Sequence, residues 1–99
     1  MKSVIQHAAA TFELAASVAW YEQRESGLGE RFYAAVQATK RFIRENPQLG
    51  TPHQRDARKH PVNGFPYLVI YRDEPERILV VAIAHAKRHP NYWQHRLQK

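Results

Sequence analysis

The sequence contains no cysteine, so no disulfide can stabilise the fold and no thiolate can act as a nucleophile or metal ligand. No apolar run approaches the roughly 20 residues needed to cross a bilayer, and no membrane association is expected. The first residues lack the sustained apolar stretch of a signal peptide, which predicts a cytoplasmic protein. At 99 residues the chain is expected to form a single domain, 1–99, stabilised by a compact core.

Acidic residues are scarce and unevenly spread. The chain has 15 Lys and Arg against 9 Asp and Glu, a formal charge of +6. Residues 1–50 carry six basic and five acidic side chains, whereas residues 51–99 carry nine and four, with five of the six His. The excess favours an acidic partner, either nucleic acid or an acidic protein, contacted by the second half. A merely solvated basic surface is the plainer alternative.

The first half predicts two helices. Residues 8–25 are rich in Ala and free of Gly and Pro, and residues 28–46 repeat apolar side chains at spacings of three and four. The connection, Ser26–Gly29, is short enough to predict an antiparallel helical hairpin. The expected core positions are Phe12, Leu14, Ala16, Val18, Ala19, Trp20 and Tyr21, then Leu28, Phe32, Val36, Thr39 and Ile43. Glu13 is expected to face water.

The second half predicts a β-hairpin. Residues 66–72 and 77–84 are rich in β-branched and aromatic side chains, and residues 73–76 form a polar turn between them. Residues 54–60 are a weaker strand candidate, limited by Pro61, and Val4–Ile5 is compatible with a short edge strand. The fold class is therefore α+β, with a short N-terminal strand, a helical hairpin packed on a small curved antiparallel sheet, and a short C-terminal segment.

Both faces of the predicted hairpin are apolar. Pairing about the turn places Ile70 near Leu79 and Leu68 near Val81 on one face. The other face is expected to hold Tyr67, Val69 and Tyr71 with Ile78, Val80 and Ala82. The helices can cover only one of these faces, so the C-terminal segment or a partner protein must cover the other.

The residues with most chemical potential follow the last strand. No glycine-rich phosphate loop, nucleophile elbow or zinc-binding helix motif is present, and no cofactor or metal is expected. His85, Arg88 and Tyr92 lie within eight residues, and such groups can stabilise phosphoryl charge and move the proton of a 2′-hydroxyl. Solvated basic residues are the alternative, and Trp93 is better explained as a hydrophobic plug against the sheet. His85 and His89 are four apart, but Pro90 disfavours a shared helical face for a metal.

Further basic residues are candidates for RNA or phosphate binding: Arg55, Arg58, Lys59 and Lys87. In a strand over 54–60, Arg58 and His60 share one face while Arg55 and Lys59 share the other. Only one of these pairs can face a groove shared with the C-terminal segment.

The order of motifs resembles the RelE/ParE toxins of type II toxin–antitoxin systems. The resemblance covers nearly the whole chain and rests on these segments: Glu13-Leu14, Ala19-Trp20-Tyr21-Glu22, Gly27-Leu28-Gly29-Glu30-Arg31-Phe32, Ile43-Arg44-Glu45-Asn46-Pro47, Arg58-Lys59, Phe65-Pro66-Tyr67-Leu68-Val69-Ile70-Tyr71 and Ala84-His85 followed by Arg88-His89-Pro90-Asn91-Tyr92-Trp93. The resemblance implies an N-terminal strand, a helical hairpin and a small sheet curved around it.

The resemblance also implies a toxin that blocks growth by one of two routes, with a decayed toxin that only binds its antitoxin as a further alternative. RelE-like members cleave mRNA on the ribosome without a metal, and ParE-like members inhibit DNA gyrase. Arg58 and Lys59 loosely match the basic strand positions of the nucleases, and Arg88 matches the arginine after the last strand, with Tyr92 or His85 in the C-terminal role. The run of several lysines of the most active nucleases is missing, and the Phe-Pro-Tyr and His-x-x-Arg-x-Pro-x-Tyr-Trp patterns are in the ParE-like style. We favour mRNA cleavage, because the His, Arg and Tyr cluster suits phosphoryl chemistry.

The family further implies a cognate antitoxin. We expect an acidic, amphipathic antitoxin segment to bind across the sheet and along the helical hairpin, with Tyr67, Val69 and Tyr71 in the contact. Such a partner would cover apolar surface and neutralise part of the basic excess.

Overall fold

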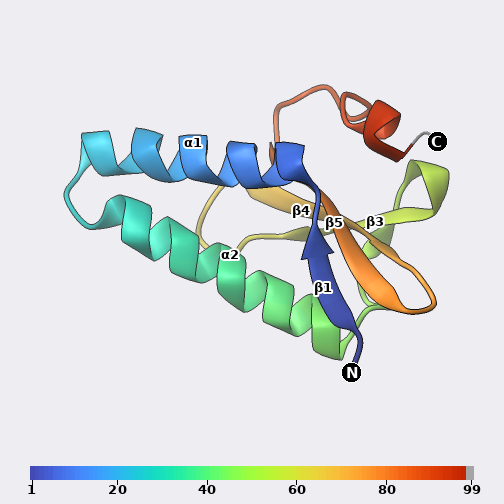
Figure 1. The fold of residues 1–99 in the computed structure, drawn as a ribbon. Coiled ribbons are helices and arrows are strands. Elements are labelled where there is room, and N and C mark those ends of the chain that lie inside the picture. Colours follow the sequence, from blue (N-terminus) through green and yellow to red (C-terminus); the bar gives the residue numbers. More distant parts are fainter. Residues whose placement is uncertain (98–99) are drawn as a thin grey trace.

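Two helices pack on a five-stranded sheet in the computed structural model, which describes residues 1–97 (Figure 1). The elements in chain order are β1 (Ser3–Gln6), α1 (Ala8–Arg24), α2 (Leu28–Glu45), β2 (Thr51–Pro52), β3 (Ala57–Pro61), β4 (Tyr67–Asp73) and β5 (Arg77–His85), with 3₁₀ turns at Gln54–Asp56 and Gln94–Leu97. The predicted α+β class, helical hairpin and central β-hairpin are confirmed.

The sheet has the strand order β1-β5-β4-β3-β2 and is mixed rather than wholly antiparallel. Strand β1 runs parallel to β5 at one edge, and every other neighbouring pair is antiparallel. The N-terminal edge strand is therefore confirmed. The weaker strand candidate over 54–60 divides into a 3₁₀ turn and β3, because Arg55 and Asp56 both have a φ of 60°, which interrupts extended backbone.

The helical hairpin depends on a tight approach between its two helices. A Cβ atom added to Gly29 would lie 2.5 Å from the carbonyl oxygen of Val18, so α2 can meet α1 only through glycine there. The Glu22 carboxylate accepts the backbone N–H groups of Gly27 and Gly29, at 2.9 and 3.0 Å. Within residues 1–97, neither this hairpin nor any other segment supplies a helix long and apolar enough to cross a membrane.

The predicted register of the β4–β5 hairpin is wrong. Tyr71 lies opposite Val80 and Ile70 opposite Ala82, so Val81 is the additional residue of a β-bulge. The bulge reverses the side-chain alternation along β5. Ala82 therefore turns away from the helices, and Ile83 takes the helix-facing place that Ala82 was expected to fill.

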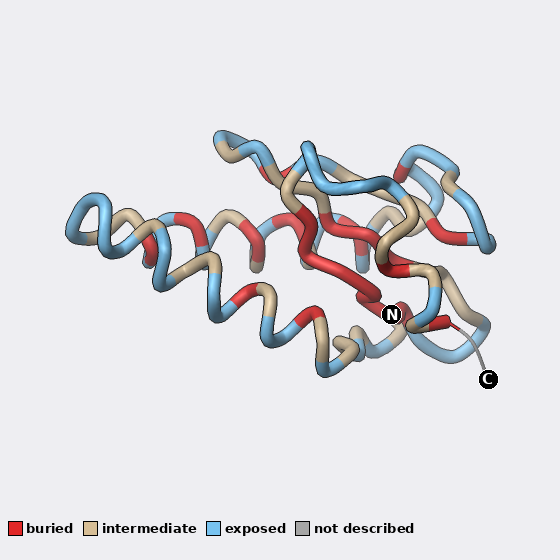
Figure 2. The backbone as a smooth tube through the Cα atoms, turned by 90° about the horizontal axis from the view of Figure 1, so that it is seen from above, coloured by how far each residue is buried: buried red, intermediate tan, exposed pale blue. Residues whose placement is uncertain are grey.

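Two apolar layers enclose the sheet. On the helical side the core includes Phe32, Val36, Val69 and Tyr71. On the other side Trp93 and Leu97 of the C-terminal segment pack on Ile70, Leu79, Val81, Ala82 and Ala84. Buried residues consequently run through the central strands in Figure 2. The C-terminal segment is thus the cover of the second face, and Trp93, with no exposed surface, is the predicted plug.

The expected orientation of α1 is correct only in part: Leu14, Val18 and Tyr21 pack on the core as predicted, whereas the stripe through Phe12 and Trp20 faces outward. The buried residues of this helix are Ala10 and Leu14, whereas Phe12 is 75% exposed and Trp20 is 49% exposed. Ala is frequent around the whole circumference of α1, so apolar spacing alone does not distinguish its inner face from its outer face. The five expected core positions in α2 are buried or half-buried, since that helix has a sharper apolar stripe.

Replacing Phe32 with Ala is expected to lower the free energy of unfolding by about 3–5 kcal/mol, because its ring is fully buried and packs on the rings of Tyr67 and Tyr21 at 4.8 and 5.0 Å. Urea denaturation of the purified variant measures this loss. Trp20→Ala is the matched control and should cost no more than about 1 kcal/mol. Equal losses in the two variants would contradict the observed orientation of α1.

Candidate functional site

A small pocket opens beyond the end of β5, where several predicted site residues meet. It encloses about 160 Å³ and is bordered by Lys59 from β3, by His85 at the end of β5, and by Arg88 in the following loop. The residues that complete it are His53, Leu68, Ile70, Ala84, Ala86, His89, Pro90, Tyr92 and Trp93. We call this cavity the rim pocket. It brings together four residues that were predicted to bind or act on phosphate: Lys59, His85, Arg88 and Tyr92.

Tyr92 is engaged by other groups of the protein. Its hydroxyl donates a 2.7 Å hydrogen bond to Oε2 of Glu13, and its ring lies 3.8 Å from the guanidinium carbon of Arg88. Burial raises the pKa of the Tyr92 hydroxyl well above its usual value, and the hydrogen bond and negative charge of Glu13 raise it further. A phenol held in this way is a poor base at neutral pH.

Glu13 is the centre of this polar cluster, contrary to the expectation that it faces water. Its carboxylate accepts bonds from both terminal nitrogens of Arg96, at 2.8 and 3.0 Å, and from the backbone N–H of Ile83 at 3.0 Å. Burial alone raises the pKa of Glu13, but the bonds from Arg96, Tyr92 and Ile83 favour the carboxylate and hold the pKa below its ordinary value of 4.5. In the sequence Glu13 is one of two carboxylates on an Ala-rich helix, and this pattern does not identify its partners.

His85 faces mainly the helical side of the sheet. Its ring packs edge-on against Tyr67, with 5.2 Å between the ring centres, and its Nδ1 accepts the backbone N–H of Lys87 at 3.0 Å. Here His85 lines a second cavity of about 540 Å³, together with Ala16, Ser17, Trp20, Tyr21, Pro66 and Tyr67. We call this cavity the α1 groove. His85 therefore borders two sites on opposite sides of the sheet.

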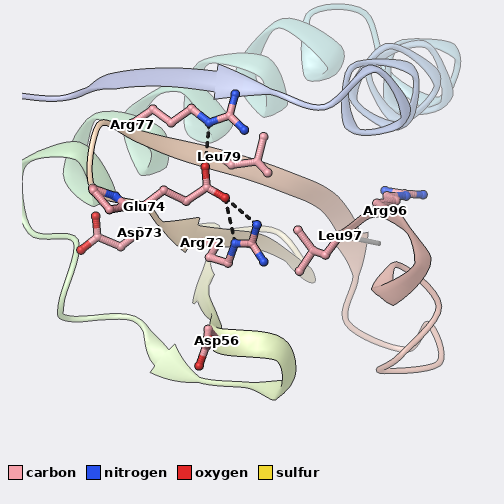
Figure 3. Close-up of a pocket in the computed structure, with 9 residues that line it drawn as sticks. Asp56, Arg72, Asp73, Glu74, Arg77, Leu79, Arg96 and Leu97 are labelled. Atoms are coloured by element: carbon pink, nitrogen blue, oxygen red, sulfur yellow. Dashed lines mark hydrogen bonds and ion pairs between the residues drawn. The ribbon is translucent and has the colours of Figure 1, made fainter. Parts of the chain in front are cut away.

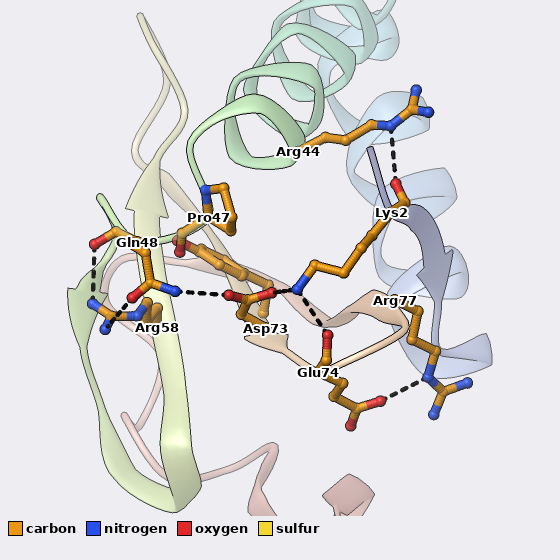
Figure 4. Close-up of polar contacts among 9 residues, drawn as sticks. Lys2, Arg44, Pro47, Gln48, Arg58, Asp73, Glu74 and Arg77 are labelled. Atoms are coloured by element: carbon orange, nitrogen blue, oxygen red, sulfur yellow. Dashed lines mark hydrogen bonds and ion pairs between the residues drawn. The ribbon is translucent and has the colours of Figure 1, made fainter.

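The remaining predicted basic residues do not enter the rim pocket. Arg58 donates to the backbone oxygen of Gly50 at 2.8 Å and to that of Gln48 at 3.2 Å, and so ties β3 to the loop after α2. Figure 4 shows the contact with Gln48. Arg55 is exposed in the 3₁₀ turn, and Lys87 is exposed beside the pocket without lining it. Two pairs were predicted for a groove shared with the C-terminal segment, Arg58 with His60 and Arg55 with Lys59. Of these four residues, only Lys59 lines the rim pocket.

Two of the three residues expected to contact an antitoxin are inside the core. Val69 and Tyr71 have no exposed surface, because their face of the sheet is the one beneath the helices. The Tyr71 hydroxyl donates to the Pro47 oxygen at 2.9 Å and accepts the Gly50 N–H at 3.1 Å, a structural role. Tyr67 alone is half-buried and reaches the α1 groove.

A wider cavity of about 770 Å³ lies beside the β4–β5 turn (Figure 3). The charges that line this cavity are paired with one another, since the Glu74 carboxylate forms salt bridges with Arg72 at 2.6 Å and with Arg77 at 2.7 Å. The neighbouring Asp73 pairs with Lys2 and accepts a bond from Gln48 (Figure 4). These pairs join the turn to the start of the chain beside β1 and to the loop after α2, and they stabilise the fold.

Comparisons with known proteins agree with this architecture. The family model described as "ParE toxin of type II toxin-antitoxin system, parDE" matches residues 4–90. A solved structure described as "Chromosomal ParDE TA system from P. aeruginosa" superposes with a TM-score of 0.64 at 20% sequence identity, covering 86% of this chain and 96% of that chain. At this identity the structural match indicates a shared fold. No curated protein matches the chain significantly.

Glu13→Gln is expected to lower the free energy of unfolding by about 3 kcal/mol at neutral pH, because it leaves the Arg96 charge buried without its carboxylate. The depressed pKa of Glu13 means that its contribution is complete above the ordinary value of 4.5 and is lost as the pH falls through the lower, folded-state value. Chemical denaturation at a series of pH values measures both effects.

The control is Glu45→Gln, which removes an exposed carboxylate at the end of α2. Wild type and the Glu45 variant should lose more stability between neutral and strongly acidic pH than the Glu13 variant does. Parallel pH profiles for all three proteins would contradict the role given to Glu13.

Proposed function

Since the chain belongs to the family of ParE toxins of type II toxin–antitoxin systems, we propose that it stops growth by binding and inhibiting DNA gyrase rather than by cutting mRNA. The observation that carries this choice is the engagement of Tyr92 by Glu13. A cognate antitoxin is the partner that restrains the toxin.

The preference for mRNA cleavage depended on His85, Arg88 and Tyr92 acting on one phosphate. General acid–base catalysis requires a group that exchanges its proton near neutral pH within reach of the reacting atoms. The Tyr92 hydroxyl donates to a carboxylate and has a raised pKa, and His85 directs its ring toward Tyr67 while its Nδ1 accepts a backbone N–H. These contacts engage the two groups, Tyr92 and His85, that the mRNA-cleavage hypothesis required as an acid–base pair beside Arg88.

The resemblance to ParE-like toxins points to DNA gyrase as the alternative target. ParE-like members of the family inhibit gyrase without the nuclease residues, and the Arg88–Trp93 segment follows their pattern. A protein that acts by binding requires a stable surface rather than exchangeable protons. The C-terminal segment provides one, because Trp93 and Arg96 anchor it to the sheet and to α1.

We assign the antitoxin to the outer face of α1 and the α1 groove. Phe12 and Trp20 are exposed along one side of the helix, and Trp20 extends to the groove. The carboxylates of Glu13 and Glu22 are turned to internal donors, whereas Arg24 lies over the Trp20 ring, 3.6 Å from its centre. An apolar face edged by positive charge is complementary to an acidic, amphipathic segment.

The purified chain is expected to inhibit DNA supercoiling by gyrase and to leave mRNA intact in a translating extract. The first readout is the topology of a plasmid incubated with gyrase, and the second is the length distribution of the mRNA. The same toxin mixed beforehand with its antitoxin is the control and should inhibit neither. Codon-linked cuts in mRNA together with normal supercoiling would overturn the gyrase proposal.

Trp20→Glu is expected to weaken binding of the antitoxin by at least about thirtyfold, because it places a charge in the centre of the apolar contact. The probe is the protein encoded beside the toxin gene, and calorimetry measures the dissociation constant. The variant should remain toxic when expressed alone and should no longer be neutralised when the antitoxin is expressed with it.

Tyr33→Glu is the matched control, because Tyr33 is 48% exposed, as Trp20 is 49%, but lies on α2 outside the groove. Its antitoxin affinity should stay close to that of wild type. Equal affinity of the Trp20 variant and wild type would place the antitoxin elsewhere, whatever the intracellular target.

A further inference from the structure

Arg88 keeps its charge available, unlike the two residues predicted to act with it. It is exposed in the loop after β5 and forms no salt bridge within residues 1–97. The Tyr92 hydroxyl, in contrast, is held by Glu13, and Nδ1 of His85 is held by a backbone N–H. Arg88 is therefore the member of this cluster that can meet an anionic group of a partner.

The Tyr92 ring is a platform for that charge. The guanidinium carbon of Arg88 lies over the ring at 3.8 Å from its centre, and that of Arg96 lies over it at 5.1 Å. The ring is fixed at its hydroxyl end, because the hydroxyl donates to Glu13 at 2.7 Å and Glu13 in turn binds Arg96. Stacking on a fixed ring restricts the plane of a guanidinium and leaves its N–H groups available at the edge.

The backbone that carries Arg88 is held by a histidine on either side. Nδ1 of His85 accepts the backbone N–H of Lys87 at 3.0 Å, and the His85 backbone oxygen accepts that of Arg88 at 3.0 Å. Nδ1 of His89 accepts the backbone N–H of Asn91 at 3.1 Å. Each imidazole thus binds the N–H two residues further along, as an Asn or Asp side chain does in a turn.

We propose that Tyr92 and His85 are positioning residues for Arg88, which is the group of this segment that contacts the inhibited target. Tyr92 orients the guanidinium through the face of its ring, and His85 shapes the loop through its Nδ1. The contact between Arg88 and the target rests on the inhibition by binding proposed for this toxin. The new assignment is that neither the Tyr92 hydroxyl nor the imidazole exchanges a proton during inhibition.

The benefit of such positioning is entropic. An exposed arginine has several rotatable bonds, and it loses their freedom when it binds a partner. A guanidinium that is already stacked has lost part of this freedom before the target arrives, so its contact is stronger and more directional. An arginine that is merely solvated would gain nothing from the ring. Activity should therefore depend on the ring of Tyr92 and not on its hydroxyl.

The test compares variants that keep the positioning contact with variants that remove it. Potency is the toxin level, measured by immunoblot, that halves the growth rate of the expressing cells. Tyr92→Phe keeps the ring and should stay within about threefold of wild type, whereas Tyr92→Leu and Arg88→Gln should each be weaker by about tenfold or more. Arg41→Gln, which removes an exposed charge from α2, is the control and should match wild type.

The same comparison applies to His85. His85→Asn supplies an oxygen that can accept the N–H two residues further along, but an amide cannot exchange a proton as an imidazole does. This variant should stay within about threefold of wild type, while His85→Ala should lose about fivefold or more, because the loop then lacks its side-chain bond.

Three further readouts separate positioning from a general loss of stability. Adding Tyr92→Leu to Arg88→Gln should lower potency by no more than about twofold, because no guanidinium is left to orient. The Nε–H resonance of Arg88 in a ¹⁵N-labelled sample should keep its ring-current shift in Tyr92→Phe and lose it in Tyr92→Leu. Both Tyr92 variants should bind the antitoxin as wild type does, since Tyr92 lies outside the α1 groove.

Four results would overturn the assignment. Tyr92→Phe or His85→Asn as weak as Arg88→Gln would require the hydroxyl or the imidazole for chemistry. Full potency of Arg88→Gln would remove the target contact, and full potency of Tyr92→Leu would remove the platform. A full additional tenfold loss in the double variant would mean that Tyr92 acts without Arg88. Growth reports potency whatever the target is, so a wild-type protein that arrests growth without inhibiting supercoiling would overturn gyrase alone.

Discussion

The β4–β5 hairpin carries apolar side chains on both faces, and each face must be removed from water for the chain to fold. The helices cover one face through Phe32 and Val36, and the C-terminal segment covers the other through Trp93 and Leu97. A domain this small has little other apolar surface to bury, so both covers are required. The positions of the candidate sites follow from this arrangement, because each lies where a cover meets the edge of the sheet.

Glu13 connects the two covers. It projects from α1 past the end of β1 and binds the backbone of Ile83 and the side chains of Tyr92 and Arg96. The carboxylate thereby fixes the C-terminal segment and holds the Tyr92 hydroxyl in a hydrogen bond. The same interaction leaves the Tyr92 ring as a platform for Arg88, whose charge then faces the rim pocket. One polar cluster thus stabilises the fold and holds the Tyr92 hydroxyl at the border of the neighbouring pocket.

The α1 groove and the rim pocket differ in chemistry and lie on opposite sides of the sheet. The α1 groove is apolar and aromatic, with Trp20 and Tyr67 in its walls, and it suits a protein segment. The rim pocket is small and cationic, and Arg88 lies at its border. His85 borders both, so a partner that fills the α1 groove would reach the residue next to the loop of Arg88. This proximity offers a physical route by which a neutralising partner can affect the basic pocket.

The amino-acid sequence by itself determined the helical hairpin, the β-hairpin and the basic second half. These features depend on local spacing, turn residues and composition, all of which act over a few residues. The α2 stripe and the Trp93 plug were predictable for the same reason, since their apolar character contrasts with their neighbours.

Only the tertiary structure decided the orientation of α1, the register of the β-hairpin and the partners of Glu13. The Ala-rich α1 offers similar apolar surface around its whole circumference. The bulge at Val81 exchanges the faces to which the following side chains of β5 point. Glu13 forms hydrogen bonds with groups some 70 to 83 residues away in the sequence. Such contacts are set by which surfaces compete best for burial once the whole chain has collapsed. The stacking of Arg88 on Tyr92 was decided in the same way, because it depends on a ring that Glu13 holds from a distant helix.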